Sequence, residues 1–463
     1  MSYQRRYSTV TRIGNTPLGG ENPIRVQSMT TTDTNDTQAC IEQAQRIIDA
    51  GGEYVRLTTQ GSREAENLKN IVAGLRARGY NTPLVADVHF NANVADVAAR
   101  YVEKVRINPG NYVDPGRTFK QLEYTDEEYA AELKKIEDRL LPFIAICREH
   151  HTAVRIGVNH GSLSDRIMSR YGDTPAGIVE SCMEFLRIFR KENFNDIVIS
   201  IKASNTVVMV ESVRLLVKQM DKEDMHYPLH LGVTEAGEGE DGRIKSAVGI
   251  GALLTEGIGD TIRVSLSEEP EAEIPVARTL VGLIKECSQL REQLESEIKD
   301  DTIHLHTNAA TWEEFQLKTA MACGALLIDR KATKLVITTD CHFEGHEDLV
   351  ALADGILQAA RIKFTKTEYI SCPGCGRTLY DLRSTIARIK EATKDMPGLK
   401  IGIMGCIVNG PGEMADADFG YVGAGRGKIS LYKKKECVMK NIPEEEAVER
   451  LLELIEQSNS EDS

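Results

Sequence analysis

The chain has 463 residues, 41% of them hydrophobic, and a formal net charge of −14, which excludes a wholly disordered chain or a coiled coil. This acidity makes general nucleic-acid binding unexpected. The sequence contains no run of about 18 apolar residues, so no membrane span is predicted. Ten cysteines are too few for a disulfide scaffold, so we expect a reducing, cytoplasmic setting with clustered cysteines held for metal or redox chemistry.

One unit repeats along about the first 270 residues: a short β-branched run, a turn, and then a helical pattern. Strands alternating with helices predict parallel pairing with right-handed crossovers. Eight units is the number that closes a (β/α)8 barrel, so we predict an α/β protein whose residues 1–286 form a TIM barrel. The predicted strands are Ile24–Met29, Tyr54–Thr58, Pro83–His89, Lys104–Asn108, Ala153–Asn159, Ile197–Lys202, Leu229–Thr234 and Thr261–Leu266.

Residues 287–363 are predicted as a small α/β insert with a structural role. The segment that begins Gly324-Ala-Leu-Leu repeats, 73 residues later, the segment that begins Gly251-Ala-Leu-Leu. This repeat favours a degenerate copy of one helix–strand–helix unit of the barrel, and the alternative is a chance match of four residues. The copy has Val336 where the barrel unit has Arg263, so it lacks a cation for phosphate.

Residues 364–463 are predicted as a compact α+β domain. Ser384–Thr393 and Pro443–Glu456 have helical patterns, whereas Leu399–Met404 and Lys428–Leu431 have strand patterns.

Polar side chains follow the barrel strands with a spacing of two residues near their carboxyl ends. Side chains alternate in and out along a strand, and the carboxyl ends of the strands form the active-site rim of a TIM barrel. We therefore expect these side chains to face one mouth. They are Arg56 and Thr58, Asp87 and His89, Arg106 and Asn108, Arg155 and Asn159, Ser200 and Lys202, Glu235, and Arg263 and Ser265.

Five of these rim residues are cations. Burying cations together without anions is costly, and an anionic ligand would remove that cost. Guanidinium groups match phosphate oxygens in a bidentate way, so the pattern predicts a phosphorylated ligand. The alternative is that the cations pair with nearby carboxylates and serve only the structure of the barrel. They are Arg56, Arg106, Arg155, Lys202 and Arg263.

Three of the ten cysteines lie in turns. Cys372 and Cys375 form a Cys-x-x-Cys pair around Pro-Gly, and Cys406 opens a glycine-rich loop that ends at Glu413. Three thiolates are one short of four ligands, and Cys437 and Glu413 are the candidates for the fourth. A structural zinc favours a fourth Cys or His, whereas a carboxylate on one iron of a cluster would leave that iron exchangeable and able to accept a substrate oxygen. Spacing alone leaves iron–sulfur and zinc open.

These two cysteine motifs, Cys372-Pro-Gly-Cys375-Gly-Arg-Thr and Met404-Gly-Cys406-Ile-Val-Asn-Gly-Pro-Gly-Glu413, resemble the signature of the 4-hydroxy-3-methylbut-2-enyl diphosphate synthases. These are the iron–sulfur enzymes of the methylerythritol phosphate route to isoprenoids. The barrel also contains segments similar to motifs of that family. They are Val26-Gln-Ser-Met-Thr, Val105-Arg-Ile-Asn-Pro-Gly-Asn, Ile156-Gly-Val-Asn-His-Gly-Ser-Leu, Gly232-Val-Thr-Glu-Ala-Gly and Gly259-Asp-Thr-Ile-Arg-Val-Ser-Leu.

The resemblance implies a (β/α)8 barrel joined to a reductase-like domain that carries a [4Fe–4S] cluster. It implies reductive dehydroxylation and ring opening of 2-C-methyl-D-erythritol 2,4-cyclodiphosphate to (E)-4-hydroxy-3-methylbut-2-enyl diphosphate. Flavodoxin or ferredoxin would supply the two electrons.

The resemblance implies the cluster ligands, and the rim positions described above predict the other roles. Glu235, at the rim, would be the catalytic acid, and Glu413 would be a catalytic cluster ligand. The cluster would be held by Cys372, Cys375, Cys406 and Glu413. The substrate would be bound by Arg56, Asp87, His89, Arg106, Asn108, Arg155, Asn159, Lys202, Arg263 and Ser265.

The insert departs from the family pattern. The short form of the family has no insert, and the long form carries a full additional barrel-like domain, whereas residues 287–363 are too few for a barrel. The chain therefore resembles the long form with a shortened insert. In the short form the cluster domain of a partner subunit closes the site, so a homodimer is possible here.

A rival interpretation is a cofactor-free barrel transferase of the pterin-binding type with a zinc-bound module at its C-terminus. Anaerobically purified protein should be brown if a cluster is present and colourless if zinc is bound.

Overall fold

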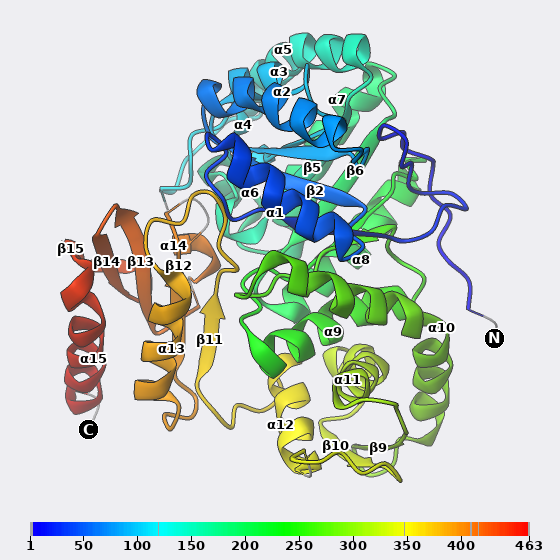
Figure 1. Ribbon diagram of the computed structural model, residues 1–463, viewed down its shortest axis with the longest axis vertical. Coiled ribbons are helices and arrows are strands. Elements are labelled where there is room, and N and C mark those ends of the chain that lie inside the picture. The colour runs from blue at the N-terminus through cyan, green and yellow to red at the C-terminus, as the bar shows by residue number, and fades with distance from the viewer. Residues whose placement is uncertain (1–2, 119, 347, 408–409, 415, 462–463) are drawn as a thin grey trace.

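The computed structural model describes residues 3–118, 120–346, 348–407, 410–414 and 416–461. Figure 1 shows three parts: a large barrel at the top, a small helical layer below it, and a sheet domain beside both. None of the described helices is long and apolar enough to cross a membrane.

Eight parallel strands form the barrel and confirm the predicted TIM barrel. Their order is β6-β5-β4-β3-β2-β1-β8-β7, and a parallel bridge between Ile199 and Leu229 connects the two edges. The strands are β1 (Arg25–Met29), β2 (Tyr54–Thr59), β3 (Leu84–Val88), β4 (Lys104–Ile107), β5 (Ala153–Asn159), β6 (Ile197–Lys202), β7 (His230–Leu231) and β8 (Thr261–Ile262).

Helices surround the barrel, and several begin after a residue whose side chain caps them, as Thr125 does by accepting from the backbone N–H of Glu128 at 3.2 Å. They are α1 (Thr37–Asp49), α2 (Ser62–Ala77), α3 (Ala92–Ala98), α4 (Pro109–Tyr112), α5 (Asp126–His150), α6 (Asp165–Tyr171), α7 (Pro175–Lys191), α8 (Thr206–Lys222), α9 (Gly239–Thr255) and α10 (Glu273–Glu297). Two short 3₁₀ turns, η1 (His160–Ser162) and η2 (Pro270–Ala272), lie at the rim.

The N-terminal segment closes the bottom of the barrel. Ile13 and Leu18 are fully buried against the first inward-facing residues of the strands, among them Tyr54 and Val85. With this end filled by apolar side chains, the barrel is open to ligands at the carboxyl ends of its strands.

The insert packs on helices α9 and α10 of the barrel. It contains two parallel strands, β9 (Thr302–His306) and β10 (Lys334–Thr338), with α11 (Trp312–Ile328) and α12 (Leu349–Ala359). The boundary predicted at residue 287 lies inside α10, so barrel and insert share that helix.

Both copies of the Gly-Ala-Leu-Leu segment lie where α9 crosses α11. A Cβ on Gly251 would stand 2.6 Å from the Met321 side chain, and a Cβ on Gly324 would stand 2.8 Å from the Val248 backbone. The two glycines therefore allow the helices to approach closely.

The C-terminal domain is a five-stranded sheet with helices on it. The first three strands are parallel and the others antiparallel. In spatial order they are β11 (Glu368–Ser371), β12 (Lys400–Met404), β13 (Phe419–Gly425), β14 (Lys428–Lys433) and β15 (Glu436–Pro443), and the helices are α13 (Leu382–Thr393), α14 (Gly410–Glu413) and α15 (Glu444–Glu461). Cys372 follows β11 and Cys406 follows β12, so the carboxyl ends of two neighbouring strands bring the cysteine loops together.

Candidate active site

A cavity lies between the barrel mouth and the cysteine loops of the same chain, with an empty volume of about 720 Å³. The C-terminal domain contributes Cys372, Pro373, Gly374, Cys375, Arg377, Met404, Gly405, Cys406 and Gly410. The barrel contributes Met29, Arg56, Asp87, His89, Arg106, Arg155, Asn159, Lys202, Thr234, Glu235, Arg263 and Ser265.

Three cations of this cavity have no carboxylate partner in the described part of the chain. The Arg56 guanidinium donates to the sulfur of Met29 at 3.0 and 3.1 Å, and burial lowers its pKa to about 10. Arg155 is 1% exposed and contacts Ser200 Oγ at 3.2 Å, while its Nε and Nη2 have no hydrogen-bond acceptor. Burial, together with repulsion from Arg56 and Arg155, lowers the pKa of Lys202. This is the arrangement expected for cations that await an anionic ligand.

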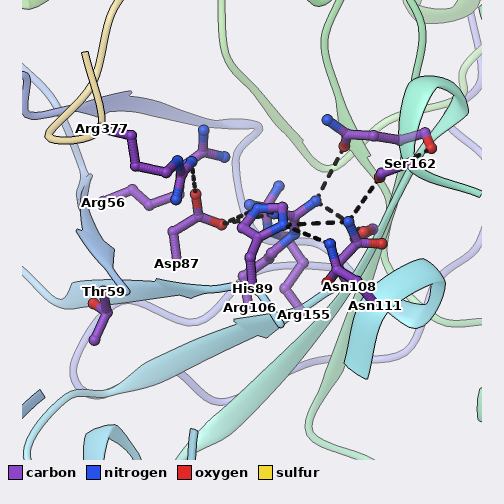
Figure 2. A network of polar contacts seen from close by, with 12 residues as sticks. Arg56, Thr59, Asp87, His89, Arg106, Asn108, Asn111, Arg155, Ser162 and Arg377 are labelled. Carbon is purple, nitrogen blue, oxygen red and sulfur yellow. Dashed lines mark hydrogen bonds and ion pairs between the residues drawn. The ribbon is translucent and has the colours of Figure 1, made fainter. Parts of the chain in front are cut away.

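Asp87 joins the barrel to the C-terminal domain. Its two carboxylate oxygens accept from Arg106 at 2.8 Å and from Arg377 at 3.2 Å, as Figure 2 shows. Arg377 comes from the C-terminal domain, and its Nε and Nη1 are buried without an acceptor. No role for Arg377 was predicted from the sequence, although its position two residues after Cys375 is a usable signal.

His89 is a neutral side chain within this network. Burial and repulsion from Arg106 hold its pKa well below the usual value. Its ring also contacts the amides of Asn108 and Asn111 at 3.4 and 3.2 Å (Figure 2). Asn108 does not line the cavity, because its amide lies behind His89 and donates to Ser162 Oγ at 2.8 Å.

Arg263 differs from Arg56, Arg155 and Lys202 because a carboxylate already neutralises it. Its Nε and Nη2 each donate to Glu273 at 3.0 Å, a buried bidentate pair. Glu273 begins helix α10, so the two-residue periodicity of the strands gave no signal for it. The contacts of Arg263 therefore match the alternative that a rim cation pairs with a nearby carboxylate and serves the structure of the barrel.

Glu235 lies at the rim after β7 in a backbone conformation with a φ of 50°, which is rare for a residue with a side chain. Its Oε2 is buried without a hydrogen-bond partner. Burial, with the nearby negative charge of Glu413, raises the pKa of Glu235 to about 8. At neutral pH this carboxyl group therefore holds a proton next to the cavity.

The Glu413 carboxylate points into the barrel rim and does not line the cavity. Oε1 accepts from the backbone N–H of Gly161 at 3.1 Å. Oε2 accepts from the backbone N–H of Ser204 and from Thr234 Oγ1, each at 3.1 Å. The predicted iron ligand thus contacts three barrel donors in this arrangement.

Comparison with known proteins identifies the family. The model described as the GcpE TIM-barrel domain matches residues 8–278, and the GcpE protein C-terminal domain matches residues 368–457. A 4-hydroxy-3-methylbut-2-en-1-yl diphosphate synthase (flavodoxin) of Phocaeicola vulgatus is 54% identical, with 98% of each chain covered. Those of Porphyromonas gingivalis and Protochlamydia amoebophila are 45% and 37% identical, with 98% of this chain and 98% and 96% of the relatives covered. The chain belongs to the 4-hydroxy-3-methylbut-2-en-1-yl diphosphate synthase family.

Membership in this synthase family confirms the family predicted from the sequence motifs and overturns the rival pterin-type transferase. The alignment with the Phocaeicola vulgatus synthase spans 602 positions, 139 more than the 463 residues of this chain. The two family models leave residues 279–367 unmatched, which is the region of the insert.

The residues of the C-terminal domain fit the iron–sulfur chemistry of the synthase family. Cys372, Cys375 and Cys406 line one cavity, and the backbone N–H of Gly405 donates to Cys372 Sγ at 3.2 Å, as expected beside a thiolate ligand. Within the described ranges, no three His, Cys, Asp or Glu side chains are arranged around a single metal ion. The thiolates of a cluster bind separate iron atoms, so they stand farther apart than the ligands of one ion. Cys437 lies on strand β15 and not in this cavity.

Proposed function

We propose that this chain reduces 2-C-methyl-D-erythritol 2,4-cyclodiphosphate to (E)-4-hydroxy-3-methylbut-2-enyl diphosphate. Two electrons and a proton are taken up, the C–O bond of the ring opens, and one oxygen leaves as water. The observation that carries the proposal is a single cavity that combines an excess of buried cations with three cysteines. The names of the relatives specify the same product.

The diphosphate is bound by the cations that lack carboxylate partners. Arg56, Arg155 and Lys202 extend from β2, β5 and β6, and β2 lies opposite β6 in the ring of eight strands, so these cations approach the ligand from opposite sides of the barrel mouth. Guanidinium forks bind phosphate oxygens in a bidentate way, and burial of these side chains reduces the screening of the contacts by water. Arg106 and Arg377 share Asp87, which leaves further donors on both free for the ligand. Asn159, Ser265 and His89 line the same cavity and orient the sugar part of the substrate.

Glu235 delivers the proton that water loss requires. It is buried, its Oε2 has no partner, and the carboxyl group is protonated near neutral pH. A general acid works best when its pKa lies near the working pH.

Cys372, Cys375 and Cys406 would hold the [4Fe–4S] cluster, and Glu413 would be the fourth ligand, which requires its carboxylate to leave the three barrel donors. When bound, the cluster supplies electrons one at a time to the substrate. Flavodoxin is the electron donor, because the names of the relatives specify it, and ferredoxin is the alternative. Cluster loops and barrel belong to one chain here, so the cavity does not require the second subunit of the homodimer considered above.

The experiment is turnover by anaerobically purified protein with a chemical reductant and the cyclodiphosphate. We expect the diphosphate product with wild type and none with Cys406→Ser. Addition of flavodoxin and its reductase should then replace the chemical reductant. A brown, iron-loaded protein that binds the cyclodiphosphate but never forms product would refute the proposed reaction.

A further inference from the structure

The contact between Glu413 and the barrel is built from three separate segments. Gly161 lies in η1, Ser204 lies between β6 and α8, and Thr234 follows β7. All three donate to the Glu413 carboxylate at 3.1 Å, and Glu413 is 3% exposed. Hydrogen bonds to a charged acceptor are about twice as strong as neutral ones, and burial strengthens them further.

The backbones around this contact approach too closely for any side chain. A Cβ on Gly412 would stand 1.7 Å from the carbonyl oxygen of Gly161, and a Cβ on Gly161 would stand 2.4 Å from the backbone nitrogen of Glu413. Ser204 Oγ also donates to the backbone carbonyl of Glu413 at 3.0 Å. The barrel surface is therefore complementary to this loop in both shape and hydrogen bonding.

Other ion pairs also connect the barrel and the C-terminal domain. The Lys245–Glu368 pair is buried, with its N and O atoms 3.6 Å apart, but it lies at the start of β11, at the opposite end of that strand from Cys372. The Arg383–Glu269 and Lys390–Glu238 pairs are solvent-accessible, with side chains 42% and 52%, and 29% and 28%, exposed. Exposed pairs of this kind contribute little to stability. The buried Arg377–Asp87 pair lies in the substrate cavity itself.

We propose that Gly161, Ser204 and Thr234 form a receptor for the Glu413 carboxylate, and that its occupation latches the cluster domain onto the barrel. Thr234 and Ser204 are thus positioning residues that act through Glu413. This step rests on the proposed function: the latch also keeps the Glu413 carboxylate out of the cavity. The side chains of this domain that line the cavity are then those of the three cysteines, Pro373, Arg377 and Met404.

The test is hydrogen–deuterium exchange of the anaerobic holoenzyme, read at peptides that contain the amides of Gly161 and Ser204. Thr234→Val removes one donor with little change of shape, and Thr234→Ser keeps the hydroxyl. Thr58→Val is the matched control. Thr58 is also a buried rim threonine and lies beside Gly376 of the cluster domain, but its Oγ1 has no hydrogen-bond partner. The visible absorption of each variant reports whether the cluster is present.

Thr234→Val should accelerate exchange at both amides roughly tenfold or more, the factor for one lost charge-assisted bond. Thr234→Ser and Thr58→Val should exchange like wild type, and all three should keep the cluster. Unchanged exchange in Thr234→Val would overturn the latch, and so would equal acceleration in Thr58→Val, which would indicate general loosening. Exchange does not require turnover, so failure of the proposed reaction would leave this result readable.

Discussion

Arg155 and Arg263 are both buried rim arginines, yet the structure predicts opposite effects on stability when each is replaced by methionine. Arg155 is 1% exposed, and two of its nitrogens have no acceptor. Arg263 is 3% exposed and forms a bidentate pair with Glu273. Methionine has a similar length and removes the charge from each position.

The expected magnitudes follow from what each substitution leaves behind. Arg155→Met removes a buried charge whose desolvation nothing offsets, so the substrate-free protein should be equally stable or up to about 3 kcal/mol more stable. Arg263→Met leaves the Glu273 carboxylate buried without its cation, which should cost about 3–5 kcal/mol. Glu273 keeps hydrogen bonds from Ser28 Oγ at 2.7 Å and from the Leu266 N–H at 3.2 Å, so the lower part of that range applies.

The assay is anaerobic thermal denaturation with and without the cyclodiphosphate, together with titration calorimetry of oxidised protein. Substrate should raise the midpoint of wild type and raise that of Arg155→Met less, because a lost charge-assisted contact costs about 1.5–3 kcal/mol, or roughly tenfold or more in affinity. If Arg155→Met lowered the substrate-free midpoint while Arg263→Met left it unchanged, the assignment of free and paired cations would be refuted.

Three further predictions concern the cluster, the proton and the domain contact. Serine in place of Cys372, Cys375 or Cys406 should each abolish iron and sulfide content, whereas Cys437→Ser should not, and the reverse pattern in metal analysis would contradict the ligand assignment. Glu235→Gln should keep the cluster and bind substrate, but its turnover with a chemical reductant should fall by about 10²–10⁴; near-normal turnover would mean that Glu235 is not the acid. Gly412→Ala should keep iron but lose turnover, because its Cβ would stand 1.7 Å from Gly161 O; Gly282→Ala, with no atom within 4 Å of its Cβ, should behave like wild type, and an active Gly412→Ala would show that close docking is not required.

Local sequence patterns predicted the barrel and most residues of its mouth, because both follow from short-range periodicity. Each of the eight predicted strands overlaps a strand of the structure, and a spacing of two residues brought Arg56, Asp87, Arg106 and Arg155 to one cavity. Asn108 obeys the same spacing but turns behind His89. Alternation therefore predicts which face of a strand a side chain occupies, but not whether a larger neighbour covers it.

Contacts between segments far apart in the sequence could not be predicted in this way. Glu273 pairs with Arg263 from the first residue of a helix, and Arg377 reaches Asp87 from a separate domain. The donors to Glu413 include two backbone amides, which carry no residue-type signal at all. The cysteine motifs were informative because ligand chemistry restricts both residue type and spacing.

The position of the insert explains how one chain brings its cysteines to its own barrel. Helix α12 ends beside α8, where Thr206 Oγ1 donates to the carbonyl of Ala359 at 2.5 Å. Strand β11 begins shortly after, at Glu368. The Glu368 carboxylate forms ion pairs with Arg361 at 2.6 Å and with Lys245 of α9 at 3.6 Å. Burial opposes ionisation of Glu368, but these two cations outweigh it and hold its pKa below the usual value. Ser371 then pairs with Ala236 in a parallel bridge, next to Glu235 at the barrel rim. The insert thus places the first strand of the C-terminal sheet at the barrel rim after β7. Cys372 directly follows Ser371, so it also lies at this rim.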